Sequence, residues 1–370
     1  MALLYIIIAL FVFYSLLILY YWLAWKSAPV YIPDISKGLK ISLIIPARNE
    51  AKNIGALLSS LQRQTYPREL FEIIVVDDSS SDETANVVRQ YPKVTLLHLN
   101  ESGVNSYKKK AIETGITASS GEWIVTTDAD CTVQPEWLQT IVSYQQKTNA
   151  VLIAAPVDLN CNVTLLQIFQ ATDFMILQAI TGASVHKKIH SMGNGANLAY
   201  EKKSFYEVSG FAGIDNIASG DDMLLIHKIW KRYPGKLHYL KSKKAIVTTQ
   251  PMQTWKTFFN QRIRWASKAK QYDDKRITVV LLLVYLFNLS FLALVVAGFF
   301  CYYYWLWLAG FWIVKTLVEW PLAYSTSVFF DKQKLLKYFF FFQPLHIVYI
   351  ILSGLLGQLG KYEWKGRKVK

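Results

Sequence analysis

The chain has 370 residues, enough for one large domain or two ordinary ones, and its 52% hydrophobic and 15% aromatic content exceeds that of an ordinary soluble protein. The net charge of +14 favours anionic partners such as lipid headgroups or a nucleotide diphosphate. Nucleic acid is not an expected partner, because the chain has no compact arm rich in Arg and Lys. The three cysteines are odd in number, widely spaced and without a metal-ligand pattern, which fits a reducing compartment.

Long uncharged stretches indicate a membrane protein. Residues 2–25 carry no charge and are long enough to cross a bilayer once. A cleaved signal peptide is the alternative, but no basic residue precedes this stretch and its apolar core is too long. We therefore expect a transmembrane anchor over residues 1–25. Lys26 and the basic domain that follows predict that the domain faces the cytoplasm of a multi-pass protein in the cell membrane.

After a linker with prolines and a glycine, strands and helices alternate along the chain. The pattern predicts strands at 41–45, 71–76, 94–99 and 123–127, with helices to about 64, after 83 and over 108–118. Such alternation is typical of an α/β fold with a mostly parallel sheet. No Gly-x-Gly-x-x-Gly follows the first strand, so a dinucleotide site is not expected, and phosphate loops of the Walker type are absent.

Polar and acidic residues follow three of these strands. They are Pro46–Glu50, the pair Asp77 and Asp78, and the pair Asp128 and Asp130. The carboxyl ends of parallel strands share one edge of a sheet, where open α/β sheets bind ligands. The two-residue spacing of Asp128 and Asp130 points both carboxylates to one side of an extended backbone, which suits a hard divalent cation shared with phosphates. The alternative is a solvated surface turn.

Two of the next segments have two interpretations each. Residues 150–157 predict a strand, and 162–183 predict a helix whose apolar side either joins the core or lies in the membrane interface. Gly193, Asn194 and Gly195 either allow a substrate to approach closely or form a plain turn. Asp221 and Asp222 precede an apolar run, where acidic residues are often helix caps.

A last segment, near 252–270, is amphipathic and aromatic, which suits a membrane interface. Gln261, Arg264 and Trp265 have the spacing that places them on one face of a helix. The alternative is a basic interfacial helix without chemistry.

The ordered pieces PARNE, VDDSSSDET, TDAD, GDD and QRIRW, which extend from Pro46 to Trp265, resemble those of family-two glycosyltransferases with the GT-A fold. The Asp-Asp pair is similar to that of hyaluronan synthases, and cellulose synthases are more distant relatives. The ending Trp364-Lys365-Gly366-Arg367 resembles the tail of ceramide glucosyltransferases and carotenoid-acid glycosyltransferases. The resemblance implies a nucleotide-sugar donor, with UDP favoured, and Mn²⁺ or Mg²⁺ as cofactor.

The resemblance also assigns roles to residues by motif. Asp222 would be the catalytic base, with Asp221 beside it, and Asp128 and Asp130 would hold the metal. The implied donor-binding residues are Pro46, Arg48, Glu50, Asp77, Asp78, Lys108, Asp128, Gln261, Arg264 and Trp265. The implied acceptor-binding residues are Gly193, Asn194, Gly195 and Trp265. Tyr107 stands where many members have a glycine before the lysine.

The C-terminal region predicts spans near 277–300 and 303–324 and an apolar segment near 338–360. Lys315 and Glu319, four residues apart, are expected to pair or to face the protein. Lysines at 332–337 and basic residues at 365–370 both favour the cytoplasm, and one span cannot join two cytoplasmic ends. Either the last segment, which contains Pro344, is re-entrant, or the tail lies outside. The expected domains are thus 1–25, 26–276 and 277–370.

We expect an inverting, metal-dependent transfer of a sugar to a membrane lipid, which fits the few spans and the tail. A processive polysaccharide synthase is the alternative within the family, although a secretion channel usually needs more helices. A non-catalytic membrane scaffold is the alternative of another class, and the presence of all the expected acidic residues argues against it. An Asp-rich phosphoryl-transfer enzyme is a third alternative.

Overall fold

The computed structural model describes residues 2–34, 38–99, 106–161, 164–217, 220–272, 274–359, 362–364 and 367–369. The chain divides into two compact units. Unit 1 contains Met1–Ala28, Cys161–His190 and Pro251–Tyr362, and unit 2 contains Pro29–Asn160, Ser191–Gln250 and Glu363–Lys370. The helices expected near 162–183 and 252–270 belong to unit 1 with the terminal helices, and the expected domain bounds remain a prediction.

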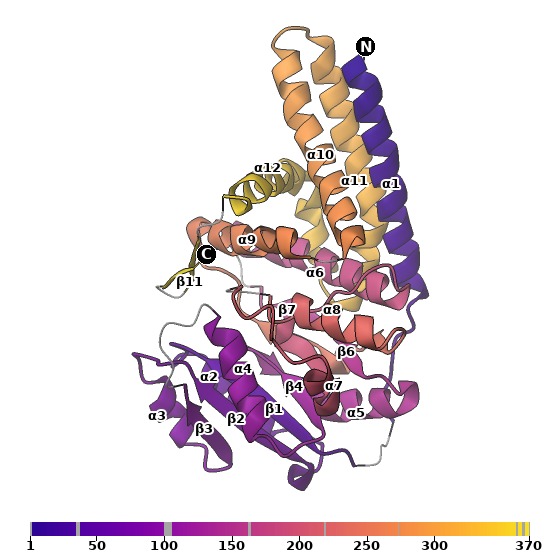
Figure 1. The fold of residues 1–370 in the computed structure, drawn as a ribbon. Helices are drawn as coiled ribbons and strands as arrows, with labels where there is room; N and C mark the ends of the chain where they lie inside the picture. The colour runs from indigo at the N-terminus through magenta and orange to yellow at the C-terminus, as the bar shows by residue number, and fades with distance from the viewer. Residues whose placement is uncertain are drawn as a thin grey trace. The chain divides into compact units, whose positions relative to one another are not determined.

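Unit 2 is built on a seven-stranded sheet with the order β3-β2-β1-β4-β8-β6-β9 (Figure 1). Its strands are β1 (Ile41–Ala47), β2 (Phe71–Asp77), β3 (Val94–His98), β4 (Trp123–Thr126), β6 (Leu152–Ala154), β8 (Leu198–Glu201) and β9 (Leu237–Tyr239). Strands β1 to β4 are parallel to one another, β8 is antiparallel to β4 and β6, and β9 is parallel to β6. The predicted mostly parallel sheet is confirmed, and its order places the carboxyl ends of β2, β1 and β4 side by side.

Apolar strands and close helix packing explain this sheet. β1 and β2 are buried along most of their length, as expected of parallel strands covered on both faces. The helices of unit 2 are α2 (Ile54–Gln62), α3 (Thr84–Arg89), α4 (Tyr107–Ala118), α5 (Trp137–Thr148), α7 (Lys202–Glu207) and α8 (Met223–Arg232). A Cβ at Gly115 of α4 would lie 2.6 Å from the Ile44 Cγ2 on β1. Glycine therefore lets α4 lie directly on the sheet.

The single strand expected over 150–157 is wrong, because two strands of different sheets occupy that stretch. β6 belongs to the large sheet, whereas β7 (Val157–Leu159) joins β5 (Thr132–Val133) and β10 (Val247–Thr249) in a three-stranded sheet. Pro156 lies between β6 and β7 and has no N–H for a ladder. Its carbonyl oxygen accepts from the Asn197 Nδ2 at 2.7 Å. A further pair, β11 (Tyr362–Trp364) and β12 (Arg367–Val369), lies near the C-terminus.

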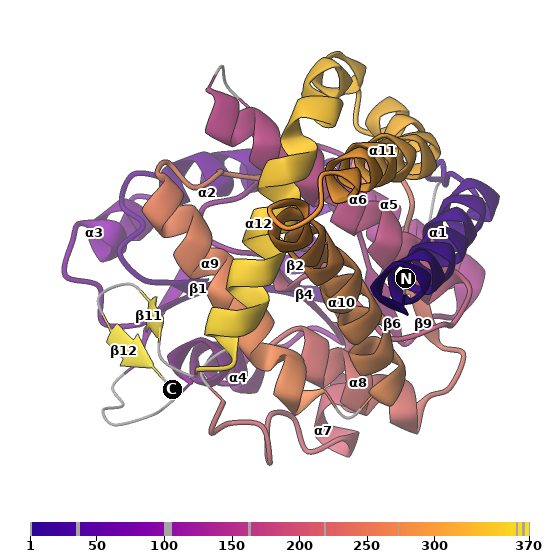
Figure 2. The ribbon, with the colours of Figure 1, turned by 90° about the horizontal axis from the view of Figure 1, so that it is seen from above.

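Unit 1 is helical. It contains α1 (Ala2–Ser27), α6 (Leu165–His186), α9 (Trp255–Ser267), α10 (Lys275–Gly298), α11 (Tyr303–Phe329) and α12 (Phe339–Gly357). Helices α1, α10 and α11 run alongside one another, and α12 lies across their direction beside α9 (Figures 1 and 2). Among the residues that the structure describes, four segments are long and apolar enough to cross a membrane, namely Ala2–Ser27, Lys275–Gly298, Tyr303–Phe329 and Gln333–Gly357. These segments agree with the apolar stretches predicted from the sequence.

A polar cluster joins three of these apolar helices. The Lys315 Nζ lies 2.6 Å from the Glu319 Oε1 on α11, as the spacing predicted. The Tyr14 hydroxyl of α1 donates to the same carboxylate, and the Gln343 Nε2 of α12 donates to its other oxygen at 2.6 Å. Buried charges are tolerated in apolar surroundings when they are paired and hydrogen-bonded, so this cluster fixes how α1, α11 and α12 pack.

Candidate active site

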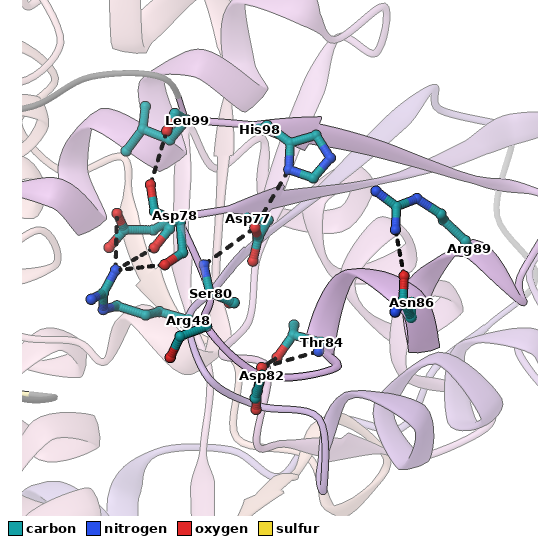
Figure 3. Close-up of polar contacts among 12 residues, drawn as sticks. Arg48, Asp77, Asp78, Ser80, Asp82, Thr84, Asn86, Arg89, His98 and Leu99 are labelled. Atoms are coloured by element: carbon teal, nitrogen blue, oxygen red, sulfur yellow. Dashed lines mark hydrogen bonds and ion pairs between the residues drawn. The ribbon is translucent and has the colours of Figure 1, made fainter.

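The segments after β1 and β2 form the first part of the candidate site in unit 2. Arg48 follows β1, and its Nη1 donates to the carbonyl oxygens of Asp78 at 2.6 Å and Ser79 at 3.1 Å (Figure 3). The same Nη1 lies 3.8 Å from the Asp78 Oδ1. Pro46, within β1, is in register with Val76 of β2. The predicted convergence of the β1 and β2 ends is confirmed.

Glu50 and Asp82 secure the turns beside this part of the site. The Glu50 Oε2 accepts from the Asn53 Nδ2 at 2.7 Å, and its backbone N–H donates to the Thr84 hydroxyl at 2.7 Å. The Asp82 carboxylate accepts from the backbone N–H groups of Thr84 at 3.0 Å and Ala51 at 3.1 Å. These bonds tie the loop after β1 to the loop after β2.

Asp77, the last residue of β2, has one carboxylate oxygen with protein partners and one without. Its Oδ2 accepts from the Ser80 N–H at 3.3 Å and lies 3.4 Å from the His98 Nδ1 (Figure 3). Its Oδ1 is buried and has no hydrogen-bond partner among the residues that the structure describes. A buried acceptor left unpaired costs free energy, so an N–H or O–H donor from a ligand would be favourable here.

Lys108 joins the second part of the site. Its Nζ lies 2.6 Å from the Asp128 Oδ1 beyond β4 and 3.2 Å from the Asp221 Oδ2 before α8. Burial alone would lower the pKa of Lys108, but the charges of Asp128 and Asp221 outweigh it and raise the pKa well above its usual value. A single ammonium group thus links the Asp-x-Asp segment to the acidic pair, although the two are far apart in sequence.

Gly195 lies directly against the acidic pair. Its N–H donates to the Asp222 Oδ2 at 3.4 Å, and its carbonyl accepts from the Thr126 hydroxyl at 2.8 Å. A Cβ added at Gly195 would lie 2.9 Å from the Asp221 Oδ2. Close approach of the Asp221 carboxylate therefore favours glycine here, and the predicted approach of a substrate remains a prediction. The Asp222 Oδ1 accepts from the Met223 N–H at 2.7 Å, so this residue also caps α8.

The other two residues of this predicted acceptor segment make local contacts. The Asn194 Oδ1 accepts from the Ala196 N–H at 3.0 Å. A Cβ at Gly193 would lie 2.5 Å from the Ile226 Cδ1 of α8. Close packing against α8 thus explains Gly193 without a ligand.

The two carboxylates of the Asp-x-Asp segment suit a shared cation better than a closed metal cage. The Asp128 side chain is 35% exposed, which leaves it accessible to a ligand. In the part of the chain that the structure describes, no group of three or more His, Cys, Asp or Glu side chains could hold a metal. Mg²⁺ is typically bound by one or two carboxylates together with substrate phosphates. Asp128 and Asp130 could supply two carboxylate ligands of such a cation, and the metal site remains a prediction.

Cys131 follows this pair. Burial, followed by the charges of Asp130 and Asp128, raises the pKa of its thiol well above the usual value. The thiol is therefore neutral, and Cys131 is a small buried side chain beside the carboxylates.

Gln261, Arg264 and Trp265 lie on α9 in unit 1, so their placement around the acidic residues remains a prediction. Trp265 packs against the Phe174 ring with the centroids 6.1 Å apart, and the Arg262 guanidinium lies 4.3 Å from the Trp265 ring centroid. The Arg262 Nη2 also donates to the buried Asp173 Oδ2 of α6 at 2.9 Å. This ion pair holds α9 against α6.

Asp173 and His98 were not predicted from the sequence. Asp173 lies within an apolar helical pattern, and a single acidic residue there was the available signal. His98 ends β3, whose neighbour β2 ends in Asp77, and that position was the signal for His98.

Residues 42–208 match the family model described as glycosyl transferase family 2. The chain is 27% identical over 256 residues to the probable glycosyltransferase YdaM of Bacillus subtilis, covering 67% of this chain and 59% of that protein. It is 35% identical over 108 residues to the 4,4'-diaponeurosporenoate glycosyltransferase of Staphylococcus aureus, covering 29% of this chain and 28% of that protein. The matches thus span less than two thirds of either relative.

Among solved structures, the chain resembles the mannosyltransferase PcManGT from Pyrobaculum calidifontis in complex with GDP-Man and Mn²⁺. The TM-score is 0.61 at 19% identity, and the match covers 96% of this chain and 99% of that one. At this identity the likeness establishes the fold. The family match, the relatives and the fold identify residues 42–208 as a glycosyl transferase family 2 domain with the GT-A fold.

Proposed function

We propose that the protein transfers a sugar from a nucleotide-diphosphate donor to a membrane lipid, with inversion at the anomeric carbon. The observation that supports this most strongly is the Lys108 ammonium between Asp128 and Asp221. It brings a candidate diphosphate and metal position next to a candidate base position. Both positions are needed for a transfer in which a diphosphate leaves while a hydroxyl attacks.

The donor would lie along the ends of β2, β1 and β4. The unpaired Asp77 Oδ1 suits an N–H or O–H donor of a nucleoside, and a uracil imide is one such group. A divalent cation on Asp128 and Asp130 would supply positive charge that offsets the charge of the leaving diphosphate. By the resemblance, Arg264 would add a second positive charge there, Gln261 would border the donor, and Trp265 would contact the acceptor sugar.

The proposed step is a single displacement. The Asp222 carboxylate takes the proton of the acceptor hydroxyl, and that oxygen forms a bond to the anomeric carbon. The bond between the anomeric carbon and the diphosphate oxygen breaks with both electrons, and the nucleoside diphosphate leaves. No carboxylate attacks carbon, so the configuration inverts. Asp221 pairs with Lys108 in this scheme and keeps its carboxylate beside that of Asp222.

The arrangement within unit 1 supports three spans and one in-plane helix. Helices α1, α10 and α11 run alongside one another, whereas α12 lies across them (Figure 2). If α12 lies in the interface, the lysines at 332–337 and the basic C-terminus are on the same side of the membrane, and the conflict over charge disappears. That side would be the cytoplasm, because Lys and Arg residues that flank membrane segments are favoured there.

A lipid acceptor is supported by these few spans and by the relative that is named for glycosylating diaponeurosporenoate, a carotenoid acid. The test is to incubate membranes containing the protein with labelled UDP- and GDP-sugars and extract them with organic solvent. We expect one added sugar on an extractable product. A long water-soluble polymer would instead establish a polysaccharide synthase. No transfer or donor hydrolysis with any sugar would contradict the proposal and favour a scaffold.

A further inference from the structure

Three consecutive lysines at the start of α4 have different partners. Lys108 contacts carboxylates of the candidate site, and the Lys110 Nζ lies 3.4 Å from Glu113 near the surface. Lys109 is only 2% exposed, and its Nζ donates to the carbonyl oxygens of Ile214 and Ile217 at 2.6 Å each. Lysine is rarely buried to this extent, because its charge must be compensated. The position of Lys109 therefore has a structural purpose.

The carbonyls that Lys109 binds belong to the segment that leads into Asp221. This segment follows α7 and contains residues at positive φ, including Gly210 at 48° and Gly213 at 81°. It has no helix or strand ladder, and its backbone bonds are those of turns, such as the Ile217 N–H to the Ile214 oxygen at 3.3 Å. From the other side, the Lys228 Nζ of α8 donates to the carbonyl oxygens of Gly210 at 2.6 Å and Ala212 at 2.9 Å. Two ammonium groups thus hold the backbone from α4 and α8.

We propose that Lys109 is a positioning residue for the acidic pair Asp221 and Asp222. Helix α4 fixes this pair at two points, since Lys108 binds the Asp221 carboxylate and Lys109 binds the backbone that precedes it. Lys109 contacts neither donor nor acceptor in this scheme. Its consequence for transfer rests on the proposed function, whereas its hold on the segment does not.

The consequence follows from the geometry of general-base catalysis. A base displaced by about 1 Å from its productive position can lose about 100-fold in rate. Lys109→Met keeps an unbranched apolar stem but removes the N–H donors from Ile214 and Ile217. We expect it to lower kcat about ten- to a hundred-fold and to leave the dissociation constant for the donor nucleotide within about twofold, since Lys108 keeps its own contacts with Asp128 and Asp221 and the other donor residues are on other elements.

The experiment compares the full-length wild type with three variants, Lys109→Met, Lys109→Gln and Lys110→Met. Three quantities are measured for each protein: hydrogen exchange of the 209–217 backbone, kcat, and the affinity for UDP or GDP. Lys110→Met is the matched control from the next position and should behave as wild type in all three. Lys109→Met should speed exchange in 209–217 at least tenfold. Lys109→Gln is the less disruptive substitution and is used if Lys109→Met does not accumulate. It should speed the same exchange by a smaller factor.

Exchange at the wild-type rate in both Lys109 variants would overturn the proposal, as would an equal effect in Lys110→Met. Faster exchange with an unchanged kcat would overturn the positioning role. If the wild-type protein transfers no sugar, the proposed function fails while the exchange still tests the hold of Lys109 on the segment. The two failures are therefore distinguishable.

Discussion

Charged residues have different partners in the two units. In unit 1 buried charges form closed pairs, in which a charge lies next to an opposite charge. Lys315 pairs with Glu319 along α11, and Arg262 of α9 pairs with Asp173 of α6. In unit 2 several carboxylates at the sheet edge keep capacity for a ligand, since the Asp77 Oδ1 is unpaired and the Asp128 side chain is 35% exposed. From this difference we expect the charges of unit 1 to stabilise packing and the carboxylates at the sheet edge of unit 2 to serve binding.

The comparison predicts opposite effects of mutation. Removing a charge in unit 1 should cost stability, because the partner is left buried and uncompensated. Removing a carboxylate at the edge in unit 2 should cost binding or rate and leave the melting temperature almost unchanged. Each prediction below tests one side of this contrast.

Asp222→Asn should have the largest effect. Loss of a general base lowers rates by about 10²–10⁴-fold, so sugar transfer should fall by that factor. Asparagine also caps helices, so α8 keeps its first-turn bond and the melting temperature should stay near that of wild type. Transfer assays and thermal melting of the same preparation measure both. Retained turnover would refute the assignment of Asp222 as the base.

Arg262→Met should destabilise unit 1 strongly, because it leaves the Asp173 carboxylate buried without its cation. Breaking one partner of a buried pair costs about 3–5 kcal/mol, measured as the shift in unfolding of the detergent-solubilised protein. The double variant Arg262→Met with Asp173→Leu removes both charges and should recover much of the loss. If the single variant is as stable as wild type, the closed-pair description of unit 1 is wrong.

Asp77→Ala should weaken nucleotide binding with little loss of stability. An acceptor that pairs with a ligand donor contributes about 1–3 kcal/mol, which corresponds to about 5- to 150-fold in the dissociation constant for UDP or GDP. Glu83→Ala is the matched control, since Glu83 follows the same loop and its carboxylate binds the exposed Asn86. Equal affinities in wild type and Asp77→Ala would remove Asp77 from the donor site.

The smallest effect is expected at the surface of unit 2, where Lys244 pairs with Glu136 at 2.7 Å. The hydrogen bond from Lys244 lowers the pKa of Glu136, so its stabilisation is present above the unfolded pKa and is lost as the pH falls through the folded pKa. Lys244→Met should cost about 0.2–1 kcal/mol at neutral pH and less in high salt. A loss that is independent of salt would show that packing, and not charge, is responsible.

The sequence predicted the parallel sheet and the apolar helices because both depend on local patterns. Strand–helix alternation and the acidic residues after strands were sufficient to place Asp77 and Asp128 on one edge of one sheet. Lys109 and Asp173 were not predicted, because a lysine run usually lies on the surface and one acid in an apolar helix has no visible partner. Their roles depend on contacts with residues about a hundred positions away. The break at Pro156 was missed because an apolar run was read as one strand.

We expect Asp128 and Asp130 to bind a nucleotide diphosphate together with a divalent cation at the edge of the sheet. Titration of the purified protein with UDP and GDP, with and without Mn²⁺, measures this binding. Mn²⁺ should tighten binding of one nucleotide at least tenfold in the wild type and not in the double variant Asp128→Asn and Asp130→Asn. Binding that is equal in both proteins and unaffected by Mn²⁺ would contradict it.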